Sequence, residues 1–139
     1  IAAELRKRLR PHTRALILTD RVEHVHLLAE ILAEHRPVRL TGELPQAARK
    51  DAMAQVRGGA RLTIATAGLL GEGVDVPGWD LLLMASPFAG GTRTVQAVGR
   101  VCRAAAGKTS ATVVDLVDSR VPALVAAHRQ RESVLGRAS

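Results

Sequence analysis

The stretch Ala15-Leu16-Ile17-Leu18-Thr19-Asp20 decides the fold of this chain. Its residues are apolar without a break from Ala15 to Leu18, whereas a strand with one wet face would alternate apolar and polar side chains. An unbroken apolar run is typical of a strand that is covered on both faces, as in a parallel sheet. The sequence therefore predicts a buried strand from Arg14 to Thr19.

Four more short runs follow that are nearly unbroken in hydrophobicity, and amphipathic stretches separate them. This alternation of strand and helix predicts a doubly wound α/β domain with a mostly parallel sheet. Strands are expected, after the first, at Val38 to Leu40, Leu62 to Thr66, Leu81 to Ser86 and Ala111 to Leu116.

Several helix ends carry recognisable signals. Asp20 and Glu23 resemble a capping box before an apolar stripe, and Pro45 is placed to open a helix that Gly58 and Gly59 close. A basic lead-in helix is predicted over Ala2 to Arg10. For the last helix, Asp118 or Ser119 is the predicted cap before Pro122, and Leu135 to Ser139 is predicted to be a frayed end.

Length and composition indicate one domain. With 139 residues, of which 47% are hydrophobic, residues 1–139 can form one core but hardly two. The chain begins at Ile1, so we expect it to be part of a larger polypeptide. Its single cysteine, Cys102, fits a reducing cytoplasm, and no apolar run approaches the ~18 residues of a membrane span. A soluble, cytoplasmic protein without a membrane partner is expected.

The charge favours a polyanionic partner. The formal net charge is +7 and the isoelectric point is about 11.2, which gives a long-range positive potential. Only two aromatic residues, Trp79 and Phe88, are present, and base stacking needs several exposed rings. We therefore expect nucleic acid to be bound through its phosphates. The alternative is that the arginine-rich composition of the chain reflects the base composition of the genome.

The segment Gln96-Ala97-Val98-Gly99-Arg100-Val101-Cys102-Arg103 gathers polar side chains on one helix face. Gln96, Gly99, Arg100 and Arg103 are three, four and seven residues apart, and no Asp or Glu occurs from Leu81 to Val114. Two arginines without acidic partners indicate an external anion, for which a phosphate is well suited. A solvated surface helix is the alternative.

Polar residues also follow the carboxyl ends of the predicted strands, where ligands of parallel sheets bind. Hydroxyls, glycine amides and one arginine could line a phosphodiester track there, although ordinary caps and turns would use the same residues. The segments are Thr19-Asp20-Arg21, Thr41-Gly42-Glu43, Thr66-Ala67-Gly68 and Ser86-Pro87-Phe88 with Gly90 and Gly91.

Other chemistries are less favoured. A paired-carboxylate hydrolase at Glu72 and Asp75 lacks supporting motifs. Gly107-Lys108-Thr109 lacks the strand and first glycine of a phosphate-binding loop. His24 and His26 point to different sides of a helix, so no metal site is predicted.

Together these segments resemble the C-terminal RecA-like domain of superfamily 2 helicases, nearest to the DExH branch of repair and restriction-type translocases. Ala15 to Asp20 is similar to motif IV, Ala65-Thr66 through Pro77 to motif V, and Gln96 to Arg103 to motif VI. Ala97 departs from the arginine that many relatives have after the glutamine. The resemblance covers Ala15 to about Leu135 and implies a RecA-like three-layer sandwich of five or more strands.

The resemblance also implies roles for individual residues. Arg100 and Arg103 would reach the γ-phosphate of ATP, and Gln96 would sense it. Gly73, Asp75 and Gly99 would lie by the nucleotide, with Asp75 near the ribose. The nucleic acid, DNA rather than RNA by this resemblance, would contact Thr19, Arg21, Gly42 and Thr66.

The chain contains neither a Walker A loop nor a DExH acidic motif, so ATP and Mg²⁺ are expected to be bound mainly by a preceding RecA-like domain. The expected function is half of an ATP-dependent helicase or translocase, inactive as an ATPase by itself. Two alternatives stay open at this stage: a non-catalytic module that binds nucleic acid or a partner, and the motor of a restriction or conflict-system enzyme.

Overall fold

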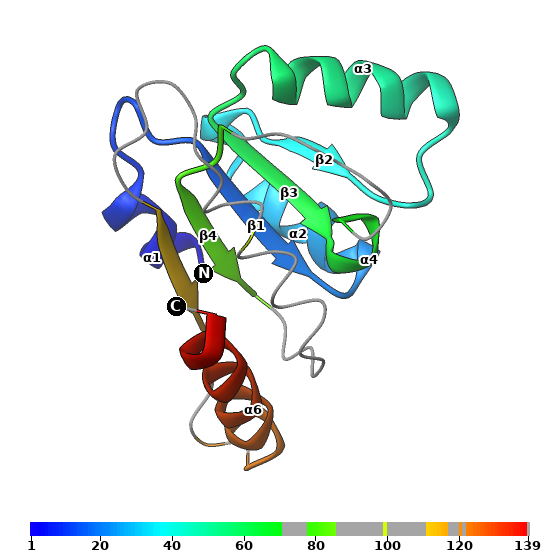
Figure 1. Cartoon of the computed structure of the whole chain (residues 1–139). Coiled ribbons are helices and arrows are strands. Elements are labelled where there is room, and N and C mark those ends of the chain that lie inside the picture. The colour runs from blue at the N-terminus through cyan, green and yellow to red at the C-terminus, as the bar shows by residue number, and fades with distance from the viewer. Residues whose placement is uncertain (71–77, 86–98, 100–110, 117–119, 121, 139) are drawn as a thin grey trace.

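The computed structural model describes residues 1–70, 78–85, 99, 111–116, 120 and 122–138 (Figure 1). The described elements are, in chain order, α1 (Ala2–Arg8), β1 (Ala15–Thr19), α2 (Val22–Ile31), the 3-10 turn η1 (Ala33–His35), β2 (Val38–Leu40), α3 (Gln46–Arg57), β3 (Leu62–Thr66), α4 (Ala67–Leu70), β4 (Leu81–Met84), β5 (Thr112–Asp115) and α6 (Pro122–Ala138).

The five strands form one parallel sheet in the order β2-β3-β1-β4-β5. All five residues of β1 are buried, which is what its unbroken apolar sequence predicts for the central strand. The α/β fold with a parallel sheet is therefore confirmed, and all five expected strands are present.

Helices cover both faces of the sheet, and the alternation of side chains along β1 separates two cores. Leu16 and Leu18 pack with α3, α4 and Trp79, whereas Ala15 and Ile17 pack with α1 and α2. Figure 1 shows α3 on one side of the sheet and α2 on the other. The three-layer arrangement predicted for the chain is thus observed.

The first strand begins at Ala15 rather than Arg14, because the groups of Arg14 hold other elements. Its amide donates to Asp80 Oδ1 (2.9 Å), and its guanidinium donates to the carbonyl of Val56 at the end of α3. A Cβ atom placed on Gly78 would overlap this guanidinium. Arg14 therefore joins α3 to the start of the sheet.

The predicted capping box at the start of α2 is wrong. The helix begins at Val22, and Arg21 occupies the N-cap position in an extended conformation without a side-chain cap. Asp20 precedes the N-cap by one residue, which is too early for the reciprocal bonds of a capping box. The ends of α3 are as predicted, with Pro45 at its N-cap, Gly58 at its C-cap and Gly59 at φ +104°.

The last helix, α6, differs from the sequence prediction at both ends. The prediction placed Pro122 inside the first turn after a cap at Asp118 or Ser119, whereas the helix begins at Pro122 and continues to Ala138 instead of fraying from Leu135. Most of its residues are good helix formers, so one late glycine does not end it. The predicted caps Asp118 and Ser119 lie outside the described residues. His128 Nδ1 lies 2.7 Å from Asp115 Oδ2 and links α6 to β5.

In the described part of the chain, no helix combines the length and the apolar composition that crossing a membrane requires.

Candidate nucleic-acid interface

Three threonines lie side by side where β2, β3 and β1 end. Thr19 and Thr66 are register partners in β1 and β3. Leu40 pairs with Ala65, so the next residue of each strand places Thr41 beside Thr66. The carboxyl ends of strands that are distant in sequence thus lie at one edge, as is predicted for a parallel sheet.

The three threonines differ in exposure. Thr19 and Thr41 are buried, with 0% and 2% of their surface exposed, whereas Thr66 is half-buried. A buried hydroxyl cannot present itself directly to a ligand. Of the predicted contact residues on these strands, Thr66 is therefore the more accessible one, and Thr19 is placed to orient its neighbours.

Thr19 is hydrogen-bonded to His24, which was not predicted from the sequence to be part of this site. Its Oγ1 lies 2.8 Å from His24 Nδ1, and the amide of Arg21 donates to the same oxygen at 3.5 Å. The hydroxyl thus ties the end of β1 to the first turn of α2. The sequence signal for this contact is a hydroxyl and a histidine five residues apart across a strand-to-helix junction.

His24 is neutral near pH 7 in this setting. Partial burial lowers its pKa, and the positive charges of the amino terminus and Arg21 lower it further. Neutral imidazole carries one proton, so Nδ1 either accepts the Thr19 hydroxyl proton or donates to its oxygen. Both arrangements keep the bond, and neither adds a charge at this edge.

Arg21 supplies the positive charge of this edge. It is exposed at the N-cap of α2, and its guanidinium has no acidic partner within the described residues. Backbone amides at the start of a helix favour anions as well. An exposed guanidinium beside these amides can bind one phosphate group.

Gly42 follows β2 and is exposed. A Cβ atom placed on it meets no atom within 4 Å, and its φ is not positive, so the fold itself does not require glycine there. A ligand backbone could therefore approach the main chain closely at this position. Gly68, in the short helix α4, has the same open surroundings.

Most of the residues predicted to act on the nucleotide are not among those that the structure describes. Gln96, Arg100, Arg103, Gly73 and Asp75 lie outside the described residues, so their roles stay predictions. Gly99, the described residue of that segment, is helical and exposed.

Within the described ranges, no three His, Cys, Asp or Glu side chains are grouped as a metal site would require.

Residues 2–105 match the family model described as the helicase conserved C-terminal domain. No curated protein sequence matches the chain.

Solved structures with a similar fold include the following three. E. coli DEAD-box protein SrmB is 25% identical, with a TM-score of 0.72 over 91% of this chain and 74% of the chain in that structure. The C-terminal part of the Fun30 ATPase domain is 14% identical, with a TM-score of 0.77 over 93% of this chain and 44% of that one. S. cerevisiae Dbp5 bound to RNA and ADP BeF3 is 17% identical, with a TM-score of 0.70 over 93% of this chain and 33% of the chain in that structure.

Proposed function

This chain belongs to the helicase conserved C-terminal domain family, and from that membership we propose that it is the second motor domain of an ATP-dependent nucleic-acid helicase or translocase. The match covers residues 2–105, and the five-stranded parallel sheet agrees with the C-terminal domains of superfamily 2 helicases. This joint match in sequence and fold is the observation that carries the proposal. DEAD-box proteins are among the neighbours, so assignment to the DExH branch is not supported by them.

In this proposal, the carboxyl edge of the sheet holds one strand of nucleic acid. Arg21 binds a phosphate, Thr66 offers an accessible hydroxyl, and open space at Gly42 admits the ligand backbone. Thr19 and His24 position Arg21 by fixing the turn that carries it. No base-reading group is needed, because phosphate contacts alone give affinity without sequence selectivity.

The choice between DNA and RNA is a separate prediction. The sequence resemblance favours DNA, whereas Dbp5, one of the structural neighbours, is bound to RNA. We propose binding through the phosphate backbone that both share. Equal affinity for matched DNA and RNA strands, or preference for RNA, would contradict the DNA prediction and leave the motor assignment intact.

ATP would lie between this domain and a preceding RecA-like domain. That other domain would hold most of the nucleotide and Mg²⁺, since this sequence has no Walker A loop or DExH motif. From this side, Arg100 and Arg103 would place positive charge at the γ-phosphate, Gln96 would contact the same group, and Gly73, Asp75 and Gly99 would border the nucleotide. Such cations stabilise the charge of phosphoryl transfer.

The direct test compares the 139-residue chain with a polypeptide that also carries the preceding domain. We expect the chain alone to release no phosphate from ATP with Mg²⁺ and nucleic acid present, and the two-domain polypeptide to turn over. Metal-dependent ATP hydrolysis by the chain alone would refute the proposal. So would a two-domain polypeptide that never hydrolyses ATP, which is the expectation for a non-catalytic module.

A further inference from the structure

Arginines gather at the opposite edge of the sheet, where the parallel strands begin. Arg36 precedes β2, Arg61 precedes β3, and Arg10 lies in the turn before β1. Val38 pairs with Thr63 and Ala15 pairs with Leu62, so the segments that lead into β2, β3 and β1 reach the same edge of the sheet. Three segments that are distant in sequence thus bring arginines to three adjacent strands. We call Arg10, Arg36 and Arg61 the amino-edge cluster.

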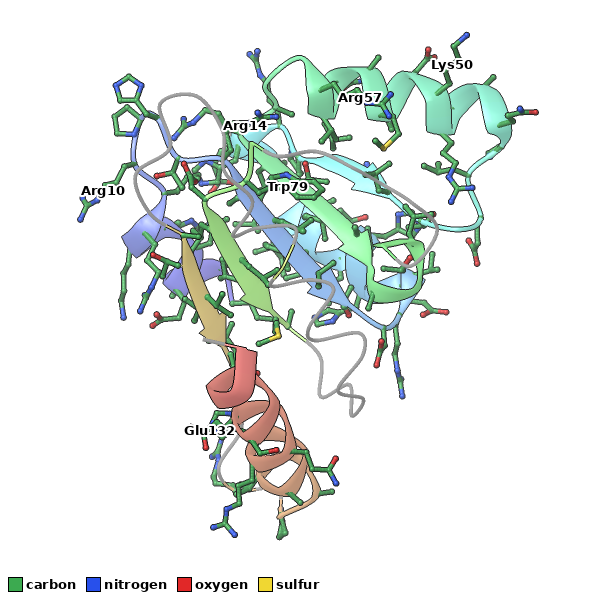
Figure 2. The ribbon with its side chains drawn as sticks, in the orientation of Figure 1. Arg10, Arg14, Lys50, Arg57, Trp79 and Glu132 are labelled. Carbon is green, nitrogen blue, oxygen red and sulfur yellow. The ribbon has the colours of Figure 1, made fainter. Side chains whose placement is uncertain are left out.

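All three side chains of the amino-edge cluster belong to exposed residues. Arg61 donates from its guanidinium to the carbonyl oxygen of Arg10 at 2.9 Å, which holds these two residues together. Arg14, at the same edge, turns inward to the carbonyl of Val56 and serves the fold instead. Figure 2 shows Arg10 projecting away from the ribbon and Arg14 lying over the strand starts.

The acidic side chains near this edge are engaged elsewhere. Glu34 binds Arg6 at 2.7 Å, and Asp80 accepts the amide of Arg14 at 2.9 Å. Within the described residues, no carboxylate forms an ion pair with any member of the amino-edge cluster. Like charges that a fold holds together without acidic partners are favourable sites for an external anion.

We propose that the amino-edge cluster is a second binding surface for the phosphate backbone of nucleic acid, on the edge opposite the carboxyl-edge interface. Adjacent strands are about 4.8 Å apart, so the cluster spans about 10 Å from β2 to β1, enough for more than one phosphate. Guanidinium groups match phosphate oxygens in geometry as well as in charge. The inference rests on the nucleic-acid binding in the proposed function and adds a second site to it.

The test measures binding of the full 139-residue chain to fluorescein-labelled oligo(dT) of about 20 nucleotides, a length that exceeds a single contact site. Anisotropy titrations at several NaCl concentrations give the slope of log affinity against log salt. The variant Arg10→Gln/Arg36→Gln removes two exposed charges whose side chains form no hydrogen bond or ion pair within the described residues. Lys50→Gln/Arg129→Gln is the matched control on α3 and α6, and Figure 2 shows Lys50 at the far end of α3.

Each phosphate contact contributes about 0.7 to the salt slope of a single strand, so the amino-edge variant should lose about 1.4 in slope. At 0.1 M salt this corresponds to roughly 25-fold weaker binding. The control should keep the wild-type slope. An equal loss in both variants would show that only net charge matters and would overturn the inference.

Two further outcomes separate this inference from the proposed function. Weaker binding in Arg21→Gln, with the amino-edge variant unchanged, would overturn the second surface and support the carboxyl-edge interface. Polyglutamate and unlabelled oligo(dT) are compared as competitors at equal total charge. If polyglutamate competes as strongly as oligo(dT), the cluster binds acidic proteins, and the nucleic-acid inference is overturned. The ATPase test above is independent of both outcomes.

Discussion

Replacing Thr19 by valine tests whether the buried hydroxyl holds the junction between β1 and α2. Valine keeps the volume and β-branching of threonine, so the main loss is the hydroxyl that lies 2.8 Å from His24 Nδ1 and accepts the amide of Arg21. A net hydrogen bond contributes about 0.5–1.5 kcal/mol, and an abandoned partner adds a further cost when it is buried. Because His24 is only half-buried and can turn to water, we expect a total loss of about 1–2 kcal/mol.

The assay is urea unfolding followed by far-ultraviolet circular dichroism, with the free energy of unfolding extrapolated to water. Thr112→Val is the matched control, since Thr112 is an exposed threonine on β5. The control should change the free energy by less than about 0.5 kcal/mol. Equal effects of the two substitutions would refute the reasoning, because the Thr19 hydroxyl would then contribute nothing specific.

Three other changes give distinct outcomes. Gly42→Ala should leave the melting temperature unchanged, since its Cβ would meet no atom, yet weaken oligonucleotide binding; unaltered affinity would argue against close approach there. Gly78→Ala should displace the Arg14 guanidinium from Val56 and cost about 1–3 kcal/mol in urea unfolding, whereas Gly68→Ala, in open space, should cost nothing. The pKa of His24 is lower in the folded chain than in the unfolded chain, so the unfolded chain binds more protons at mildly acidic pH. The contribution of His24 to stability is therefore complete above about pH 6.5 and is lost as the pH falls below that value. His24→Gln should flatten that part of the stability profile, and an unchanged profile would contradict the assignment.

The inner strands β1, β3 and β4 were predictable because burial on both faces favours apolar runs. The edge strand β2 departs from this pattern, since Arg39 is exposed between the buried Val38 and Leu40. Val38–Leu40 and Leu62–Thr66 have the predicted limits, and the other three strands are shorter than predicted by one or two residues at their ends. The shortening of β1 has a tertiary cause, since the bond of Arg14 to Asp80 joins residues 66 positions apart. No local pattern contains that information.

Interactions across the strand-to-helix junction were less predictable. Asp20 and Glu23 satisfy the capping pattern, but the extended backbone at Arg21 moves the helix start by one residue. The role of His24 depends on the path of the chain after Thr19, the last residue of β1. Local sequence does not determine that path. The amino-edge cluster likewise appears only when strand order places β2, β3 and β1 side by side.

The central claim is that this domain supplies cations to an ATP site that another domain completes. The most direct measurement is the steady-state ATPase rate of the two-domain polypeptide, with nucleic acid saturating, for wild type, Arg103→Ala and the exposed control Arg129→Ala. The claim predicts that Arg103→Ala lowers turnover by about 10³-fold or more while nucleic-acid affinity and the control rate are unchanged. Wild-type turnover in Arg103→Ala would contradict it.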